Sequence, residues 1–152
     1  MKPGKCVDRI ERMKGVEREY QVATMAKEVL IEGLGQDTTM LTKKGLHQAD
    51  LNSLQANLEA TYLVRLFAEF ETGLKDYWKN GLTKNSRTGV RDIIESLSSR
   101  FKILDAAKTN AHAVRKYRNR LVHEEDADGE PVDLKNARGY LCRFFGFLPS
   151  DW

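Results

Sequence analysis

Apolar residues recur at intervals of three and four along most of the 152-residue chain, the spacing of one face of an α-helix. No segment alternates apolar and polar residues over the length of a strand, so a sheet is not expected. Five periodic segments predict helices, from about Cys6 to Leu34, Leu46 to Lys79, Val90 to Leu104, Ala106 to Glu125, and Leu134 to Leu148. We therefore predict an all-α helical bundle of about five helices, in a single domain that comprises residues 1–152.

The long second helix is apolar nearly all the way round in its second half, which predicts a place in the middle of the bundle. Gly33 and Gly35 are expected to end the first helix. The turn "DADGEPV" is expected to end the fourth helix, and Pro149 the fifth. Aromatic residues follow the helical spacing and are assigned to the core or to a dimer interface: Phe67, Phe70, Tyr77, Trp78, Phe144, Phe145 and Trp152.

Composition narrows the function classes only slightly. The chain has 25 Lys and Arg against 22 Asp and Glu, a mildly basic balance that permits nucleic-acid binding without requiring it. It lacks an apolar run of the roughly 20 residues that span a bilayer, so we expect a soluble, cytoplasmic protein without membrane contact. Cys6 and Cys142 stand alone and are interpreted as structural thiols, and no metal site or cofactor is expected.

The stretch "RNRLVH" in the fourth helix carries the most informative pattern. Successive residues turn about 100° around a helix axis, which places Arg118 on the apolar stripe of this helix. That stripe comprises Ala111, Val114, Leu121 and Val122. An arginine that faces the core must find partners, because an unpaired buried guanidinium is very unfavourable.

Two further polar residues flank this arginine. Asn119 and His123 are one turn apart and are expected to face the same way, beside the apolar stripe. Together with Arg118 they supply a fixed positive charge, a neutral hydrogen-bonding group and a group that titrates near neutral pH. This set suits phosphodiester chemistry.

The long helix offers a counter-ion for the arginine. Arg65 and Glu69 are four residues apart on one stripe of that helix, so Glu69 is a candidate partner for Arg118 or for Arg65. The alternative interpretation is that these charges form only an internal structural network.

With this motif the chain resembles the HEPN superfamily, the higher eukaryote and prokaryote nucleotide-binding domains. The family signature is an arginine followed a few residues later by a histidine, with asparagine preferred directly after the arginine, and "RNRLVH" matches it. The position of the motif late in a helical bundle, before a helix rich in aromatic residues, also matches. The resemblance covers about Leu51 to Leu148.

The resemblance implies a homodimer of prokaryotic origin in which two motif helices face each other across a cleft. Many members are metal-independent endoribonucleases, and some bacterial members are toxins neutralised by a nucleotidyltransferase-type antitoxin. On this hypothesis His123 is the general acid or base, Arg118 stabilises the charged phosphorane, and Asn119 orients His123 or the phosphate. Other members are catalytically inactive dimerisation or nucleotide-binding modules, and that alternative stays open.

Three basic residues beside the motif, Arg115, Lys116 and Arg120, are candidates to bind the RNA backbone, with Lys116 and Arg120 pointing to solvent. A solvated basic face is the other interpretation of the same residues. His112 lies about 16 Å along the helix from His123 and is interpreted as an ordinary residue of the polar face. The acidic stretch that contains Gly129 lacks the ligand spacing of a calcium loop and is interpreted as a solvated turn.

Overall fold

The computed structural model describes residues 5–123 and 128–152, and within them it contains helices and no strand. The predicted all-α bundle is therefore confirmed. Five α-helices follow one another along the chain: α1 (Lys5–Gln36), α2 (Gln48–Asp76), α3 (Val90–Arg100), α4 (Asp105–Val122) and α5 (Leu134–Phe145). Two short elements accompany α2, a 3₁₀ turn before it at Thr42–Lys44 and a π-helical turn after it at Tyr77–Gly81.

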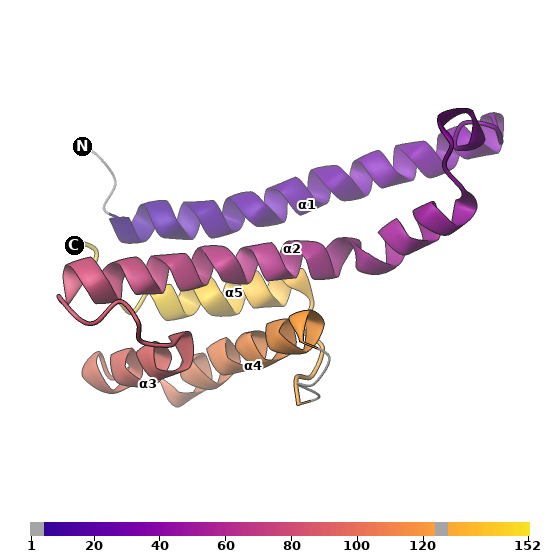
Figure 1. The fold of residues 1–152 in the computed structure, drawn as a ribbon. Coiled ribbons are helices and arrows are strands. Elements are labelled where there is room, and N and C mark those ends of the chain that lie inside the picture. The colour runs from indigo at the N-terminus through magenta and orange to yellow at the C-terminus, as the bar shows by residue number, and fades with distance from the viewer. Residues whose placement is uncertain (1–4, 124–127) are drawn as a thin grey trace.

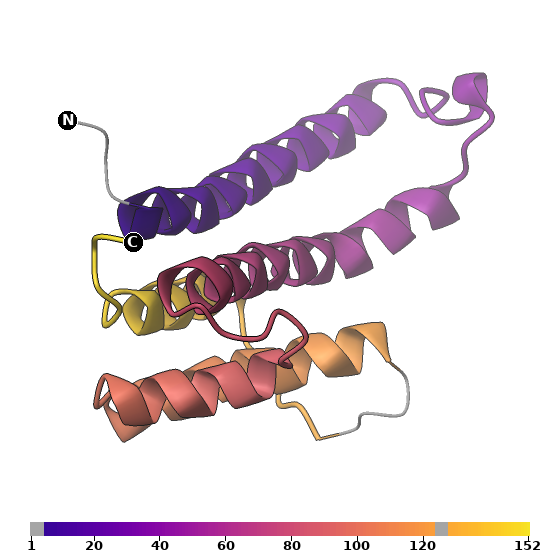
Figure 2. The same ribbon diagram turned by 60° about the vertical axis from the view of Figure 1, so that its left-hand side comes forward.

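The helices lie around α2. α1 runs antiparallel to α2 along one side, the pair α3 and α4 lies on the other side, and α5 packs against both α1 and α2 (Figures 1 and 2). α2 packs against α1, α3, α4 and α5, which confirms the central place that its apolar circumference predicts. One core joins these helices, and its largest fully buried rings are Phe67, Phe70, Phe144 and Phe145.

The far part of the α1–α2 hairpin extends beyond the other helices (Figures 1 and 2). The main core cluster of buried residues contains none between Val16 and Leu63. Along this extension α1 exposes three apolar side chains at helical spacing, Val22, Met25 and Val29. The hairpin therefore presents an apolar stripe that the described chain leaves uncovered.

Several helix ends differ from the prediction. α1 continues through Gly33 and Gly35 to Gln36, because an isolated glycine weakens a helix by only about 1 kcal/mol. α3 ends at Arg100, and Leu104 is the exposed N-cap residue of α4. α5 ends at Phe145, before the predicted Leu148, and begins at a cap in which Asp133 accepts a hydrogen bond from the backbone N–H of Asn136.

Candidate functional site

The signature residues lie at the carboxyl end of α4. The core-facing residues of this helix are Ala107, Ala111 and Val114. One turn later comes Arg118, which is half-buried. Its guanidinium carbon lies 5.6 Å from the centroid of the Phe67 ring of α2, and its Nη1 donates a hydrogen bond to Asn119 Oδ1 at 3.1 Å. The expectation that Arg118 faces the core side of α4 is therefore confirmed.

Arg118 has no carboxylate partner among residues 5–123 and 128–152. Its Nε is buried and has no hydrogen-bond acceptor within the same residues. Contact with an aromatic face stabilises a cation by roughly 0.5–2 kcal/mol, which is less than burial of a guanidinium costs. The site thus holds a positive charge that its described surroundings only partly compensate.

The expected ion pair with Glu69 is wrong. Arg65 makes a bidentate ion pair with Glu19 of α1, and this hydrogen bonding raises the pKa of Arg65 above its ordinary value. Within the described chain Glu69 forms no ion pair with Arg65 or with Arg118. The periodicity of α2 and α4 does not reveal this partner, because α1 packs directly against α2 and supplies the carboxylate.

His123 lies just outside the helix. α4 ends at Val122 and not at the predicted Glu125, while residues 124 and 125 lie outside the described residues. The backbone N–H of His123 still donates to the Asn119 carbonyl at 2.7 Å, but φ of −123° and ψ of 114° are extended values. The helical angle that placed His123 on the face of Asn119 therefore does not apply. The imidazole is exposed and makes no hydrogen bond to any described residue.

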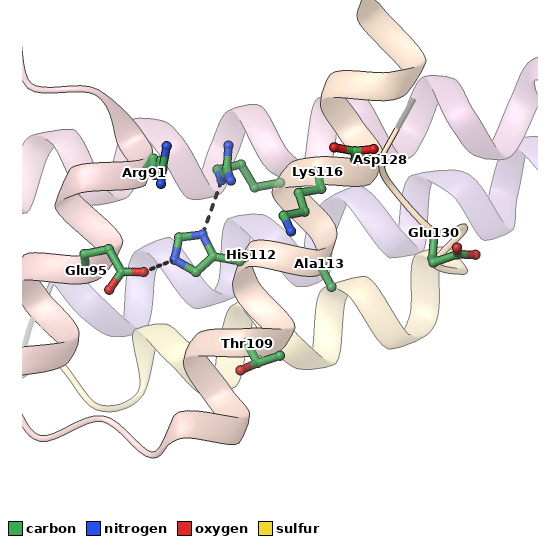
Figure 3. A pocket seen from close by; sticks show the side chains of 9 residues that line it. Arg91, Glu95, Thr109, His112, Ala113, Lys116, Asp128 and Glu130 are labelled. Atoms are coloured by element: carbon green, nitrogen blue, oxygen red, sulfur yellow. Dashed lines mark hydrogen bonds and ion pairs between the residues drawn. The ribbon is translucent and has the colours of Figure 1, made fainter. Parts of the chain in front are cut away.

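A groove between α3 and α4 lies beside the motif (Figure 3). It consists of two adjoining hollows of about 570 and 200 Å³, which share Arg91, Arg115, Lys116 and Asp128 in their walls. We call this feature the α3–α4 groove. The larger hollow reaches Glu95 and His112, and the smaller one reaches Asn119. The groove therefore ends at the residue that binds Arg118.

A chain of three side chains crosses the groove. Arg115 Nε donates to His112 Nδ1 at 3.3 Å, and His112 Nε2 lies 2.7 Å from Glu95 Oε1. Since Nδ1 accepts, Nε2 carries the proton and donates to the carboxylate. Burial lowers the pKa of His112, and the hydrogen bond to Glu95 offsets this only in part. The same hydrogen bond holds the pKa of Glu95 below its ordinary value, so the chain joins a cation, a neutral imidazole and a carboxylate.

Gly129 closes the far wall of the groove. It is buried, and a Cβ at this position would lie 2.5 Å from the carbonyl oxygen of Lys116 and 2.6 Å from Cα of Tyr117. Only glycine allows the segment after residue 127 to approach the α4 backbone so closely. Arg120 donates a hydrogen bond from Nη1 to the Gly129 carbonyl at 2.8 Å and so binds this segment to α4. Asp128 and Glu130 of the acidic stretch are exposed, as a solvated turn predicts, whereas Gly129 is buried, and residues 124–127 of the stretch lie outside the described residues.

The three predicted RNA-binding residues have different surroundings. Lys116 is exposed in the groove wall, whereas Arg115 is half-buried and bound to His112. Arg120 is exposed, as expected, but contacts Gly129. Arg91 and Glu95 were not predicted as site residues, and His112 was interpreted as an ordinary residue of the polar face. The four-residue spacings of Arg91 and Glu95 and of His112 and Lys116 were the available signal, because each pair shares one helix face.

No cluster of three or more His, Cys, Asp or Glu residues that could hold a metal ion occurs within the part of the chain that the structure describes. No helix found there has the length and hydropathy that a membrane span requires. Comparisons with known protein families, with curated proteins and with solved structures find no match to this chain.

Proposed function

We propose that the protein is a metal-independent endoribonuclease of the HEPN type, which cleaves RNA with Arg118, Asn119 and His123. The observation that carries this proposal is the half-buried guanidinium of Arg118 without a carboxylate among the described residues. A positive charge in such surroundings is a site for an anion, and a phosphodiester is an anion with oxygens that a guanidinium binds well.

The hydrogen bond from Arg118 to Asn119 fixes the direction of the guanidinium. The exposed imidazole of His123 follows one turn after Asn119, within reach of solvent and substrate. The α3–α4 groove reaches Asn119 and is the proposed path of the RNA strand. Together these features provide charge stabilisation, a proton-transfer group and a path for the chain of the substrate.

The proposed reaction is an internal transesterification. The ribose 2′-oxygen attacks phosphorus and the bond to the 5′-oxygen breaks, which yields a 2′,3′-cyclic phosphate and a 5′-hydroxyl. A base accepts the proton of the 2′-hydroxyl, and an acid donates a proton to the 5′-oxygen. The step therefore consumes no water and requires no metal. His123 serves as one of these groups, and Arg118 stabilises the charge that develops on the phosphorane.

A second copy of the chain completes the proposed site. One His123 supplies half of the acid and base pair, and the two-fold partner supplies the other. Leu121 and Val122, which were expected on the core stripe, are exposed beside His123, as residues of an interface would be in an isolated copy. The proposed partners are therefore a second copy, an RNA substrate and, if the protein is a toxin or defence effector, a nucleotidyltransferase-type antitoxin.

The test is cleavage of single-stranded RNA by the purified protein in the presence of EDTA. The proposal requires products with a 2′,3′-cyclic phosphate and a 5′-hydroxyl. It also requires that DNA of the same sequence stays intact, because DNA lacks the attacking hydroxyl. Complete inhibition by EDTA, or products with a 5′-phosphate, would exclude this chemistry.

One observation favours a second candidate function. His123 has no residue that orients its imidazole among those described. A catalytic histidine ordinarily has such a partner. On this alternative the chain is an inactive HEPN-type dimerisation or nucleotide-binding module, in which Arg118 and the groove bind an anion and no bond is broken. RNA binding without cleavage by the wild-type protein would favour it.

A further inference from the structure

We propose that the α3–α4 groove is a phosphate subsite, which binds a phosphodiester of the RNA strand next to the one cleaved at the motif. The identity of the strand as RNA rests on the function proposed above, whereas the binding of phosphate rests on the groove itself. The subsite adds a residue of α3, Arg91, and a positioning pair, His112 and Glu95, to the substrate contacts.

The charges of the groove are arranged unevenly. Among the described residues, the smaller hollow next to Asn119 is lined by Arg91, by Lys116, by Arg115, which has partners of its own, and by one carboxylate, Asp128. Arg91 and Lys116 make no ion pair with any residue in the described ranges. Glu95 faces the larger hollow, where it accepts a hydrogen bond from His112 at 2.7 Å and its charge is compensated by Lys108 at 3.4 Å. The end of the groove nearest the motif is thus cationic, and phosphate is the group on an RNA strand that such an end attracts.

The hydrogen-bonded chain gives this cationic end a fixed geometry. Glu95 accepts from His112 Nε2, which leaves His112 Nδ1 as an acceptor for Arg115 Nε. Fixing Nε sets the plane of the guanidinium, which reduces the conformational entropy that Arg115 loses on binding a ligand. Both ring nitrogens of His112 are engaged, so His112 acts through Arg115 and is not itself a proton-transfer group. His112 and Glu95 are therefore positioning residues.

The wall of the groove at Gly129 is tightly packed. Gly129 lies against the backbone of Lys116 and Tyr117 at distances that admit no side chain, and Arg120 binds its carbonyl. Asp128 and Glu130, both exposed, line the same wall.

The test measures binding separately from cleavage. A fluorescent single-stranded RNA that is 2′-O-methylated at every position cannot be cut by 2′-hydroxyl attack, so its anisotropy reports binding alone. Arg91→Ala should weaken binding about threefold or more and reduce the slope of log Kd against log salt concentration by about 0.7, since one phosphate contact is lost. The control is Arg143→Ala on α5, an exposed arginine without an ion pair in the described chain, and it should change neither quantity.

A double-mutant cycle tests the positioning role. If His112 acts through Arg115, His112→Ala should weaken binding in the wild-type background and have no effect in an Arg115→Ala background. A purely structural role of His112 would weaken both backgrounds alike, and that additivity would overturn the positioning role. Melting curves of all variants verify that the fold is intact.

The outcomes separate this inference from the proposed function. If Arg91→Ala behaves like Arg143→Ala, the subsite is refuted whether or not the protein cleaves RNA. Failure of the wild-type protein to bind the oligonucleotide at low salt refutes it as well. If the groove variants behave as expected but unmodified RNA stays intact, the phosphate subsite stands and the ribonuclease proposal fails.

Discussion

The guanidinium of Arg118 lies over the ring of Phe67, with 5.6 Å between its central carbon and the ring centroid. Phe67 is fully buried in α2, so the ring holds the cation at the edge of the core. This contact explains how an arginine can face the core side of α4 without an acidic partner among the described residues. It also places the charge where a phosphate can compensate it.

Substitution of Arg118 by lysine keeps the charge but removes the planar group. We expect Arg118→Lys to lower RNA cleavage about 100-fold, because an ammonium cannot stack on Phe67 or bind two phosphate oxygens with fixed geometry. The melting temperature should change little, since the aliphatic stem still packs. Arg143→Lys on α5 is the matched control, and equal activities of the two variants would contradict the role of Arg118.

Substitution of Gly129, in the groove wall, can be compared with the same substitution of Gly139, within α5, to test how tightly the wall packs. Gly129→Ala should destabilise the protein by about 1–3 kcal/mol, because its Cβ would lie 2.5 Å from the Lys116 carbonyl oxygen. Gly139→Ala within α5 should be neutral or stabilising by about 0.5–1 kcal/mol, since nothing lies within 4 Å of the added carbon. Thermal unfolding of both variants decides the point. Two equally stable variants would show that Gly129 does not pack tightly on α4.

The dimer should form through the end of α4. Leu121→Lys places a charge in the proposed interface and should shift the protein from dimer to monomer in light scattering, with loss of RNA cleavage. Met25→Lys introduces the same charge into the exposed stripe of α1 and should leave the dimer intact. If Met25→Lys is the variant that dissociates the dimer, the two copies associate through the α1–α2 hairpin instead, and the shared-cleft hypothesis fails. A wild-type monomer at micromolar concentration would also exclude it.

An ion pair between Arg9 and Asp76 joins α1 to the end of α2 at 3.1 Å. Burial raises the pKa of Asp76, but hydrogen bonds from Asn80 and Arg9 outweigh it and hold the pKa below its ordinary value. A carboxyl whose pKa is lowered in the folded state stabilises the protein fully at pH values above its pKa in the unfolded state, which is about 3.9. This stabilisation is lost as the pH falls through the pKa of the folded state.

Thermal unfolding between pH 6 and pH 2 therefore gives a direct test of this pair. Asp76→Asn should lower the melting temperature at pH 6 and converge with the wild type at the acidic end, because the wild-type carboxylate is then protonated. Glu28→Gln within α1, an exposed carboxylate that makes no ion pair with any described residue, is the control and should follow the wild-type curve throughout. A constant difference between Asp76→Asn and wild type at every pH would show that the charge of Asp76 contributes nothing.

The helices could be predicted from the sequence because their apolar residues recur at helical spacing, and α2 has apolar residues around its circumference. The position of Arg118 followed from the same periodicity. The partner of Arg65 could not be predicted, because Glu19 is distant in sequence and lies opposite it only once α1 packs on α2. The α3–α4 groove depends in the same way on tertiary packing, since α3, α4 and the segment around Gly129 each supply one wall. The orientation of His123 could not be predicted from helical angles, because the backbone is no longer helical at that residue.

Cleavage of a DNA oligonucleotide that contains one ribonucleotide, in the presence of EDTA, tests the central claim most directly. The wild-type protein should cut only after the ribonucleotide and leave a 2′,3′-cyclic phosphate. His123→Ala should cut about 100-fold more slowly, since the proposed mechanism assigns a proton transfer to this imidazole. The melting temperature should stay unchanged, because the side chain is exposed. Equal cutting by His123→Ala and wild type, or cutting that a 2′-O-methyl group at the ribonucleotide does not prevent, would contradict the claim.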